Sequence, residues 1–336
     1  MKFLEFTRTA KVLTDFYLAL KPEESLLVVT DTRAQEFPGV EVLLEAVLAS
    51  AHATGADSQV ITFPARSMAG VEPSKVVATA MKCANVVILM TTYSVMQTLA
   101  TTDALAAGSR VLMLPPARYV CNSPDMLFRL MPVDALEIQQ RIEFAERLGS
   151  LFRKGQNVRL LSTKGTDLSV GIGKLKVSFN PNLVREKGQR TIVPGGQVTV
   201  GVNPGEADGK CVIDGSAAPM YRPLCENITL TIKEGKVTNI QGGGEAQEYR
   251  KILSDLRDHQ VYLTAEVGVG FHPQAVLSGT PLEDERIFGA AWIGIGTNVH
   301  IGGSIKAKIH SDCVMLPPVT LSLDGRVLLK DRQFNV

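Results

Sequence analysis

The sequence is poor in several residue types that mark particular classes of protein. Its 336 residues include five cysteines but no CxxC pair, which argues against a disulfide framework or a zinc ribbon and favours a reducing cytoplasm. The formal net charge is only +1, which leaves no basic stripe for nucleic acid or an anionic membrane. One tryptophan and six tyrosines offer little surface on which bases could stack. We therefore expect a cytoplasmic protein that binds neither nucleic acid nor membrane.

Long apolar runs are also missing. Charged residues such as Lys2, Glu5 and Arg8 interrupt the amino terminus, which excludes the apolar segment of a signal peptide. The longest uncharged run, residues 83–102, contains Asn, Thr, Ser and Gln. It is typical of a buried strand followed by a helix, not of a membrane span.

The first 155 residues alternate short β-branched apolar runs with helical patterns, which is typical of a parallel sheet covered on both faces. The predicted strands are 25–31, 59–63, 85–92 and 110–116, and the predicted helices are 41–55, 71–84, 94–108 and 134–154. No GxGxxG or GxxxxGKS loop follows these strands, so the usual reason to expect a nucleotide is absent. Arg118 and Tyr119, after the fourth strand, either line a ligand crevice or belong to a solvated loop.

From residue 156 the pattern changes to alternating strands with glycine-rich turns. The turns in ADGK (207–210) and KEGKV (233–237) favour hairpins, because Gly and Asp tolerate a positive φ. One helix, residues 245–258, interrupts the strands. The fold class predicted is α/β: a parallel-sheet α/β domain over 1–155, then a mixed, mostly antiparallel α+β domain over 156–336 that carries the metal site.

Histidine is scarce, and three of the five histidines (His272, His300 and His310) lie within 39 residues. His310 and Asp312 form an HxD motif at the end of an alternating segment, residues 305–312, that predicts a strand. Side chains two apart on a strand share a face and lie about 6–7 Å apart. An imidazole and a carboxylate on one face suit a divalent transition metal. The alternative is a surface histidine beside a solvated aspartate.

Glu266 lies among apolar residues and glycines, with no charged neighbour close in the sequence. A buried carboxylate without a partner is costly, and a metal ion would supply that partner. The alternative is a hydrogen-bonded structural glutamate. His272, just before Pro273, is predicted to be a ligand, a proton shuttle or a solvated side chain.

Arg286 follows an acidic turn, residues 283–285, and precedes a stretch that is predicted to be buried. An arginine at that entrance could reach an anionic or enolate oxygen. His300 precedes Gly302 and Gly303, which permit close backbone approach at a ligand site or form a bulge. The predicted metal ligands are Glu266, His310 and Asp312, and the predicted catalytic residues are His272, Arg286 and His300.

Five blocks, taken in order, resemble the aminopeptidase T-like metallopeptidases, the thermophilic metallopeptidase family with a two-domain α/β architecture. The blocks are GTDLSVGIG (165–173), PGGQVTVGVNPGEADGKCVID (194–214), IKEGKVTNIQGGGEA (232–246), AEVGVGFHP (265–273) and GIGTN to GGSIKAKIHSD (294–312). They cover essentially the whole second domain, and the first domain is compatible in layout.

This resemblance implies two metal ions held by two Glu, two His and one Asp, of which Glu266, His310 and Asp312 match. The two other positions hold Gln197 and Trp292. Gln is a poor ligand for a dinuclear site and Trp is none. The sequence therefore retains enough ligands for one metal ion.

A single-metal branch of the same fold, the 2,5-dihydroxypyridine 5,6-dioxygenase type, is more similar. The resemblance implies one Fe(II) held by the HxD pair and one further ligand, with positions open for substrate and dioxygen. Arg286 and either His272 or His300 would then stabilise a deprotonated substrate oxygen and move protons. Because such iron usually has two His and one carboxylate, the third ligand is Glu266, His272 or His300.

Three functions follow from these residues, all with a small-molecule partner. The leading hypothesis is a mononuclear Fe(II) dioxygenase that cleaves the ring of a hydroxylated N-heteroaromatic such as a dihydroxypyridine. The second is a one-metal hydrolase of amide or peptide-like bonds, with Glu285 or Glu266 as general base. The third is a non-catalytic binder on a decayed site. The resemblance also implies a homo-oligomer.

Overall fold

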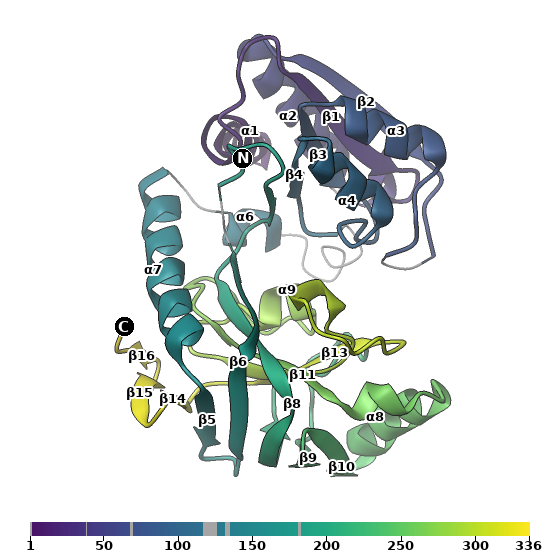
Figure 1. Cartoon of the computed structure of the whole chain (residues 1–336). Helices are drawn as coiled ribbons and strands as arrows, with labels where there is room; N and C mark the ends of the chain where they lie inside the picture. Colours follow the sequence, from purple (N-terminus) through teal and green to yellow (C-terminus); the bar gives the residue numbers. More distant parts are fainter. Residues whose placement is uncertain (1, 38, 68–69, 117–125, 132–134, 181–182) are drawn as a thin grey trace. The chain divides into compact units, whose positions relative to one another are not determined.

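The computed structural model describes residues 2–37, 39–67, 70–116, 126–131, 135–180 and 183–336. The chain divides into two compact units (Figure 1), residues 1–142 with 180–195 and residues 143–179 with 196–336. This division differs from the predicted boundary after residue 155. Residues 180–195 return to the first unit, and the helix over 135–154 begins in one unit and ends in the other. Arg118, Tyr119 and Cys121 lie outside the described residues.

The first unit contains the predicted parallel sheet, with the strand order β2-β1-β3-β4-β7. Its strands are β1 (Ser25–Asp31), β2 (Asp57–Phe63), β3 (Val86–Met90), β4 (Arg110–Met113) and β7 (Arg190–Ile192). The first four coincide with the four predicted apolar runs. The fifth, β7, was not predicted, because three residues are too few to produce a pattern.

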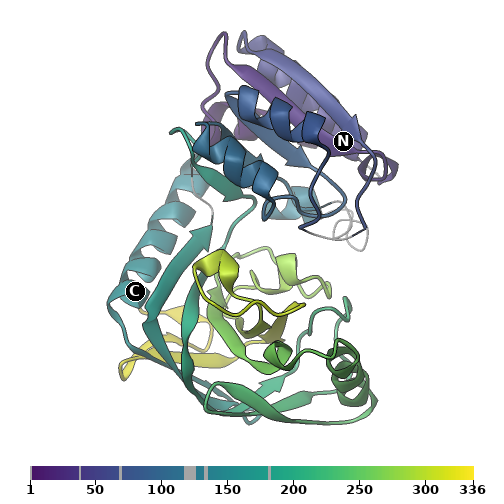
Figure 2. The ribbon, with the colours of Figure 1, turned by 45° about the vertical axis from the view of Figure 1, so that its right-hand side comes forward.

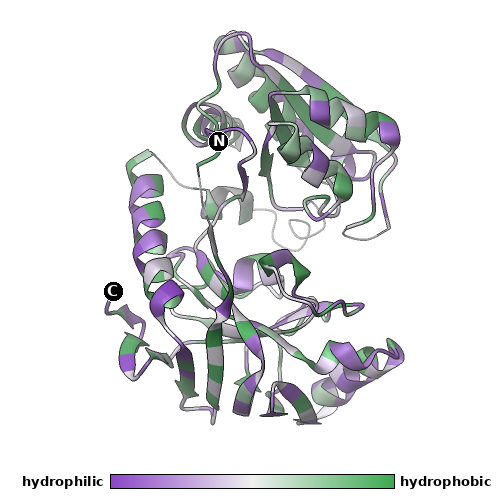
Figure 3. Cartoon of the chain, viewed as in Figure 1, coloured by the Kyte–Doolittle hydropathy of each residue, from purple (hydrophilic) through white to green (hydrophobic). Residues whose placement is uncertain are grey.

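The helices of the first unit are α1 (Lys2–Lys11), continued by a π-helical segment (Val12–Tyr17), α2 (Val40–Ala53), α3 (Lys75–Cys83), α4 (Leu99–Ala106) and α6 (Met126–Leu130). Helices α3 and α4 pack together and bury apolar side chains against the sheet, whose strands are largely hydrophobic (Figure 3). Both helices begin later than predicted. The side chains of Ser74 and Thr98 accept hydrogen bonds from Val77 N and Thr101 N, and these N-caps set where each helix begins.

The second unit is built on a sheet of 11 strands, in the order β13-β12-β11-β8-β6-β5-β14-β15-β16, with β9 and β10 branching from β8. Neighbouring strands in the described ladders are antiparallel, as predicted. The strands are β5 (Asn157–Ser162), β6 (Asp167–Asn180), β8 (Gln197–Ile213), β9 (Ile228–Lys233), β10 (Lys236–Gln241), β11 (Thr264–Gly270), β12 (Ala291–Gly296), β13 (His310–Met315), β14 (Val319–Leu323), β15 (Arg326–Lys330) and β16 (Gln333–Phe334).

Few helices accompany this sheet. The long helix α7 (Ala135–Lys154) leads into the unit, and α9 (Pro281–Asp284) is a single turn. The predicted helix over 245–258 is α8 (Gly244–Asp255), which packs beside β9 and β10 (Figure 2). Short 3-10 turns occupy Ala34–Glu36 in the first unit and His259–Tyr262 and Val299–Ile301 in the second.

The two faces of strands β8, β11, β12 and β13 differ sharply. Side chains alternate between the faces of a strand, so the register assigns each residue to one face. The residues on the core-facing side are Val198, Val200, Val202, Val267, Val269, Ala291, Ile293, Ile295, Cys313 and Met315. The opposite face carries the residues with potential chemistry, interspersed with glycine.

Two further predictions can be compared with the described residues. Cys83, Cys211, Cys225 and Cys313 are free, as expected for a chain without a disulfide framework. Residues 83–102 provide β3 and the start of α4, as predicted. None of the described helices has the length and apolar character needed to cross a membrane.

Candidate metal centre

Three neighbouring strands bring two carboxylates together across a glycine. Glu266 on β11 and Asp312 on β13 both pair with Gly294 on the central strand β12. A Cβ atom at Gly294 would lie 2.6 Å from Glu266 Cγ, 3.2 Å from Asp312 Oδ1 and 3.2 Å from His310 Cε1. The missing side chain at Gly294 therefore provides the space in which the polar side chains converge.

His310 points one ring nitrogen at these carboxylates. Its Nδ1 lies 2.8 Å from the carbonyl oxygen of Thr297, which can only accept, so Nδ1 carries the proton. Its Nε2 lies 3.0 Å from Asp312 Oδ1 and 3.5 Å from Glu266 Oε1. His310 and Asp312 share a strand face, as predicted. The strand prediction for residues 305–309 was wrong, because β13 begins at His310 and Ile305 N and Lys308 N donate instead to side chains of Asn298 and Asp258.

His300 joins the cluster from a short turn. It lies on the 3-10 turn Val299–Ile301, and its Nε2 is 2.9 Å from Glu266 Oε2. The His300 and His310 rings meet edge to face, with centroids 4.9 Å apart. The potential ligand atoms of Glu266, His300 and His310 all lie within 4.8 Å of one another, and Asp312 adjoins this group at His310.

The electrostatics of the cluster favour a cation at its centre. Burial alone would lower the pKa of His310, but the carboxylates of Asp312 and Glu266 outweigh burial and raise it. Burial alone would raise the pKa of Glu266, yet His310 and His300 hold it well below its ordinary value. The buried carboxylate of Glu266 thus stays ionised and attracts positive charge.

Asp312 provides a further indication that a metal ion fits. Its Oδ1 is buried and is assigned no hydrogen-bond partner, although His310 Nε2 lies 3.0 Å from it. Buried polar atoms are nearly always partnered, and an ion accounts for such exceptions. Two imidazoles and two carboxylates are an ordinary donor set for a divalent transition metal.

Glu285 and Arg286 lie beside Asp312 and are both buried. Burial and the facing carboxylate of Asp312 raise the pKa of Glu285 well above its ordinary value. Burial lowers the pKa of Arg286 to about 10, although Glu285, Glu283 and Asp312 oppose this, so the guanidinium stays charged at neutral pH. Arg286 donates to the carbonyl oxygen of Leu282, while its Nε is buried without a partner.

His272 does not belong to the group of ligand atoms around Glu266. Its ring is fully buried, and a Cβ atom at Gly196 would lie 2.7 Å from His272 Cβ. Its Nδ1 accepts a hydrogen bond from Gln274 N at 3.2 Å, and its backbone nitrogen donates to Arg286 O at 2.8 Å. His272 therefore anchors the segment that carries Arg286.

Gln197 and Trp292 occupy the same sheet face as the cluster. Trp292 pairs with Gly268, and a Cβ atom there would lie 2.0 Å from Trp292 Cζ2, so the indole lies directly over the glycine. Gln197 pairs with Gly270, two residues further along β11. Gln197 Oε1 and Trp292 Nε1 are both buried without a hydrogen-bond partner.

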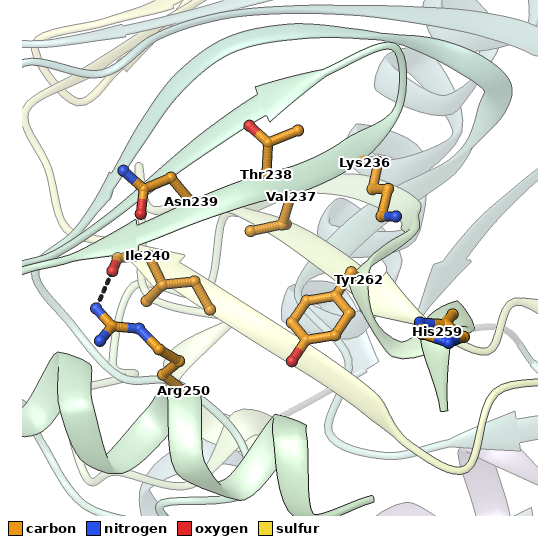
Figure 4. Close-up of a pocket in the computed structure, with 8 residues that line it drawn as sticks. All are labelled: Lys236, Val237, Thr238, Asn239, Ile240, Arg250, His259 and Tyr262. Atoms are coloured by element: carbon orange, nitrogen blue, oxygen red, sulfur yellow. Dashed lines mark hydrogen bonds between the residues drawn. The ribbon is translucent and has the colours of Figure 1, made fainter. Parts of the chain in front are cut away.

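A separate hollow of about 470 Å³ lies on the surface between β10, α8 and the turn His259–Tyr262 (Figure 4). Its lining includes Lys236, Arg250 and His259 but no carboxylate or cysteine, so it offers no set of metal ligands. Arg250 donates to the carbonyl oxygen of Ile240 across one side of the hollow.

Sequence reasoning missed the roles of Gly294 and of the Thr297 carbonyl group. The only signal for Gly294 was the spacing of glycines at alternate positions, as at Gly268, Gly270, Gly294 and Gly296. Such spacing indicates one strand face that must stay free of side chains. Nothing in the sequence indicated that Thr297 would fix the His310 tautomer.

Comparisons with known proteins identify the family of the chain. A sequence profile of the 2,5-dihydroxypyridine 5,6-dioxygenase family matches residues 16–335. The chain is similar to the 2,5-dihydroxypyridine 5,6-dioxygenase of Pseudomonas putida KT2440, with 25% identity over 236 residues. That alignment covers 67% of this chain and 64% of the relative, slightly less than two thirds of the relative's length.

Solved structures share the fold. The 2,5-dihydroxypyridine dioxygenase from Pseudomonas putida KT2440 has a TM-score of 0.80 and 19% identity, with 99% of this chain and 97% of that chain covered. Wild-type AmpT from Thermus thermophilus has a TM-score of 0.70 and 14% identity, with 99% of each chain covered. These likenesses confirm the predicted fold class. Since the profile matches nearly all of the sequence, the chain belongs to the 2,5-dihydroxypyridine 5,6-dioxygenase family.

Proposed function

We propose that this protein is a metal-dependent dioxygenase that opens the ring of a small hydroxylated N-heteroaromatic such as a dihydroxypyridine, with Fe(II) as its metal. Membership of the family supports the reaction class. The observation that carries the proposal is the convergence of His310 Nε2 with the Asp312 and Glu266 carboxylates, 3.0 Å and 3.5 Å away. With its other nitrogen held by Thr297, His310 presents Nε2 to whatever cation these carboxylates attract.

Glu266, His310 and Asp312 are the proposed metal ligands, as the sequence predicted. The sequence offered His300 or His272 in place of Glu266, whereas the 4.8 Å grouping of Glu266, His300 and His310 supports His300 as an alternative to Asp312. That alternative would give the two-histidine, one-carboxylate set that is usual for non-haem Fe(II) oxygenases. When bound, Fe(II) would supply the redox chemistry that dioxygen requires and would bind the hydroxylated substrate.

The remaining residues would bind the substrate and handle its protons. Arg286, charged and buried, has a free Nε–H that can donate to a deprotonated substrate oxygen. His300 is about one-third exposed and contacts Glu266, so it can exchange a proton between solvent and the centre. His272, predicted as a shuttle, would act by holding the Arg286 segment in place.

The first test is the metal content of protein purified anaerobically without chelator. We expect about one iron per chain in the wild type, little in His310→Ala, and oxygen uptake with 2,5-dihydroxypyridine by the wild type only. Comparing Asp312→Ala with His300→Ala identifies which of these two residues binds the metal together with Glu266 and His310, because the variant that lacks a ligand loses metal as His310→Ala does. Iron-loaded protein that consumes no oxygen with any hydroxypyridine would refute the proposal. Two metal ions per chain with amide hydrolysis would favour the hydrolase instead.

A further inference from the structure

A buried chain of polar side chains holds the strand that carries His310 and Asp312 from its core-facing side. Ser311, the residue between these two proposed ligands, points into the core, since it pairs with the core residue Ile295 on β12 and neighbouring residues alternate between faces. Its Oγ lies 2.6 Å from the hydroxyl oxygen of Tyr249, a residue of α8. Both side chains are fully buried, so a polar contact lies within an otherwise apolar core.

The hydrogen atoms of this chain have one consistent direction. Ser311 donates to the carbonyl oxygen of Ala218, which can only accept. Because the Ser311 hydroxyl has a single hydrogen, the Tyr249 hydroxyl donates to Ser311 Oγ. Cys313 Sγ lies 3.3 Å from the Tyr249 oxygen and can donate its S–H to it. Each hydroxyl therefore both donates and accepts, and a buried network that is satisfied in this way is rigid.

This chain supports β13 at the margin of its sheet. One edge of β13 pairs with β12, and the other edge meets the segment 215–218, which belongs to no named strand. Ala218 N donates to the backbone oxygen of Asp312 at 3.0 Å. The Ser311 hydroxyl adds a side-chain link to the same residue, Ala218, and the Tyr249 hydroxyl joins this link to α8.

A shift of Ser311 would move both proposed ligands at once, because peptide groups join it directly to His310 and Asp312. Metal–ligand distances tolerate only about 0.2 Å, so even a small shift of the strand would weaken metal binding. Packing alone does not require the Tyr249 hydroxyl. A phenylalanine would fill nearly the same volume without a polar group that must be satisfied.

We propose that Tyr249 is a positioning residue for the metal centre: through Ser311 it fixes the part of β13 that presents His310 and Asp312. The inference rests on the proposed function, since it assumes a metal ion at these ligands. Tyr249 touches neither the metal nor a ligand side chain, and its effect passes through the backbone of Ser311.

The test is an anaerobic competitive titration with Fe(II) of the wild type, Tyr249→Phe, Ser311→Ala and the double variant. We expect Tyr249→Phe to weaken Fe(II) binding about tenfold, the lower end of the range for contacts that support ligands. Because Tyr249 acts through Ser311, Tyr249→Phe should cause no further loss when Ser311 is already alanine. The visible spectrum of the Co(II)-loaded protein should also change in Tyr249→Phe, since that spectrum reports the coordination geometry.

Thr30→Val is the matched control. It removes one buried hydroxyl, which donates to Met90 O at 3.0 Å in the sheet of the first unit, and nearly keeps the shape of the side chain. This loss of one buried hydrogen bond should leave Fe(II) affinity and the Co(II) spectrum as in the wild type. If Tyr249→Phe does not fold, Ser311→Thr and Ser311→Val make the same comparison, because only the threonine keeps the hydroxyl. The threonine variant must then bind Fe(II) more tightly than the valine variant.

The outcomes separate this inference from the proposed function. If the wild type binds no metal, the proposed function fails and this inference fails with it. If the wild type binds Fe(II) and consumes oxygen with 2,5-dihydroxypyridine, while folded Tyr249→Phe keeps the wild-type Fe(II) affinity and Co(II) spectrum, the inference alone is overturned. A further loss on adding Tyr249→Phe to Ser311→Ala would also overturn it, since Tyr249 would then not act through Ser311.

Discussion

Gly294→Ala should damage the metal centre without removing any ligand. The added Cβ would lie 2.6 Å from Glu266 Cγ, whereas ordinary contacts measure 3.4–4 Å. Glu266 must therefore move by about 1 Å, well beyond the roughly 0.2 Å that metal–ligand distances tolerate. We expect metal affinity to fall by at least tenfold and about 100-fold at most, the range for disturbed supporting contacts. Overpacking should also cost about 1–3 kcal/mol of unfolding free energy.

The assay is a competitive metal titration, with near-ultraviolet circular dichroism to verify that the variant is folded. Gly244→Ala is the matched control, because a Cβ at Gly244 meets nothing within 4 Å and its φ is not positive. The control should bind metal like the wild type. A folded Gly294→Ala protein with unchanged metal affinity would refute the reasoning, since the ligands would then not converge over this glycine.

Three further outcomes can be measured. Burial raises the pKa of Asp284 to about 6, so the stability that its protonated form contributes is fully present below the unfolded pKa near 4 and is lost as pH rises through about 6. Asp284→Asn keeps the contacts with Ser216 and Ser278. In urea unfolding this variant should be more stable than wild type by up to about 3 kcal/mol at pH 7, with no difference at pH 4. Gly268→Ala, with its Cβ 2.0 Å from the Trp292 ring, should lower the melting temperature by several degrees in calorimetry, and an unchanged value would contradict the packing. Chelation should lower the melting temperature of wild type but not of His310→Ala.

The fold could be predicted wherever local pattern decides it. The apolar runs of β1 and β3 are buried on both faces, and their composition reflects that burial. The return of residues 180–195 to the first unit could not be predicted, because β7 has three residues and its pairing with β4 joins segments about 80 residues apart. Such a pairing depends on tertiary packing that no local pattern encodes.

In the site, likewise, residues placed by local pattern could be predicted and those placed by distant contacts could not. The i, i+2 relation of His310 and Asp312 is local, so the sequence revealed it. Glu266 was predicted to be buried without a nearby charge, but its actual partners, His300 and His310, come from 34 and 44 residues further along the chain. The position of His300 depends on the turn that Asn298 begins, whose Oδ1 accepts from Ile305 N. The sequence gives no measure of how closely that turn approaches β11.

Side chains along β8, β11, β12 and β13 alternate between the aliphatic core and the side that holds the proposed ligands, so substitutions on these strands are of two kinds. One side of these strands is a continuous aliphatic surface, and the other holds every proposed ligand on them. A substitution at an odd position of β11 therefore tests the aliphatic core, whereas one at an even position changes the side that holds the proposed ligands. Gln197 and Trp292 both lie on the side that holds the proposed ligands. We expect divergence of reaction type on this architecture to concentrate at every second residue of four strands, while the residues between them, except Ser311, drift only in volume.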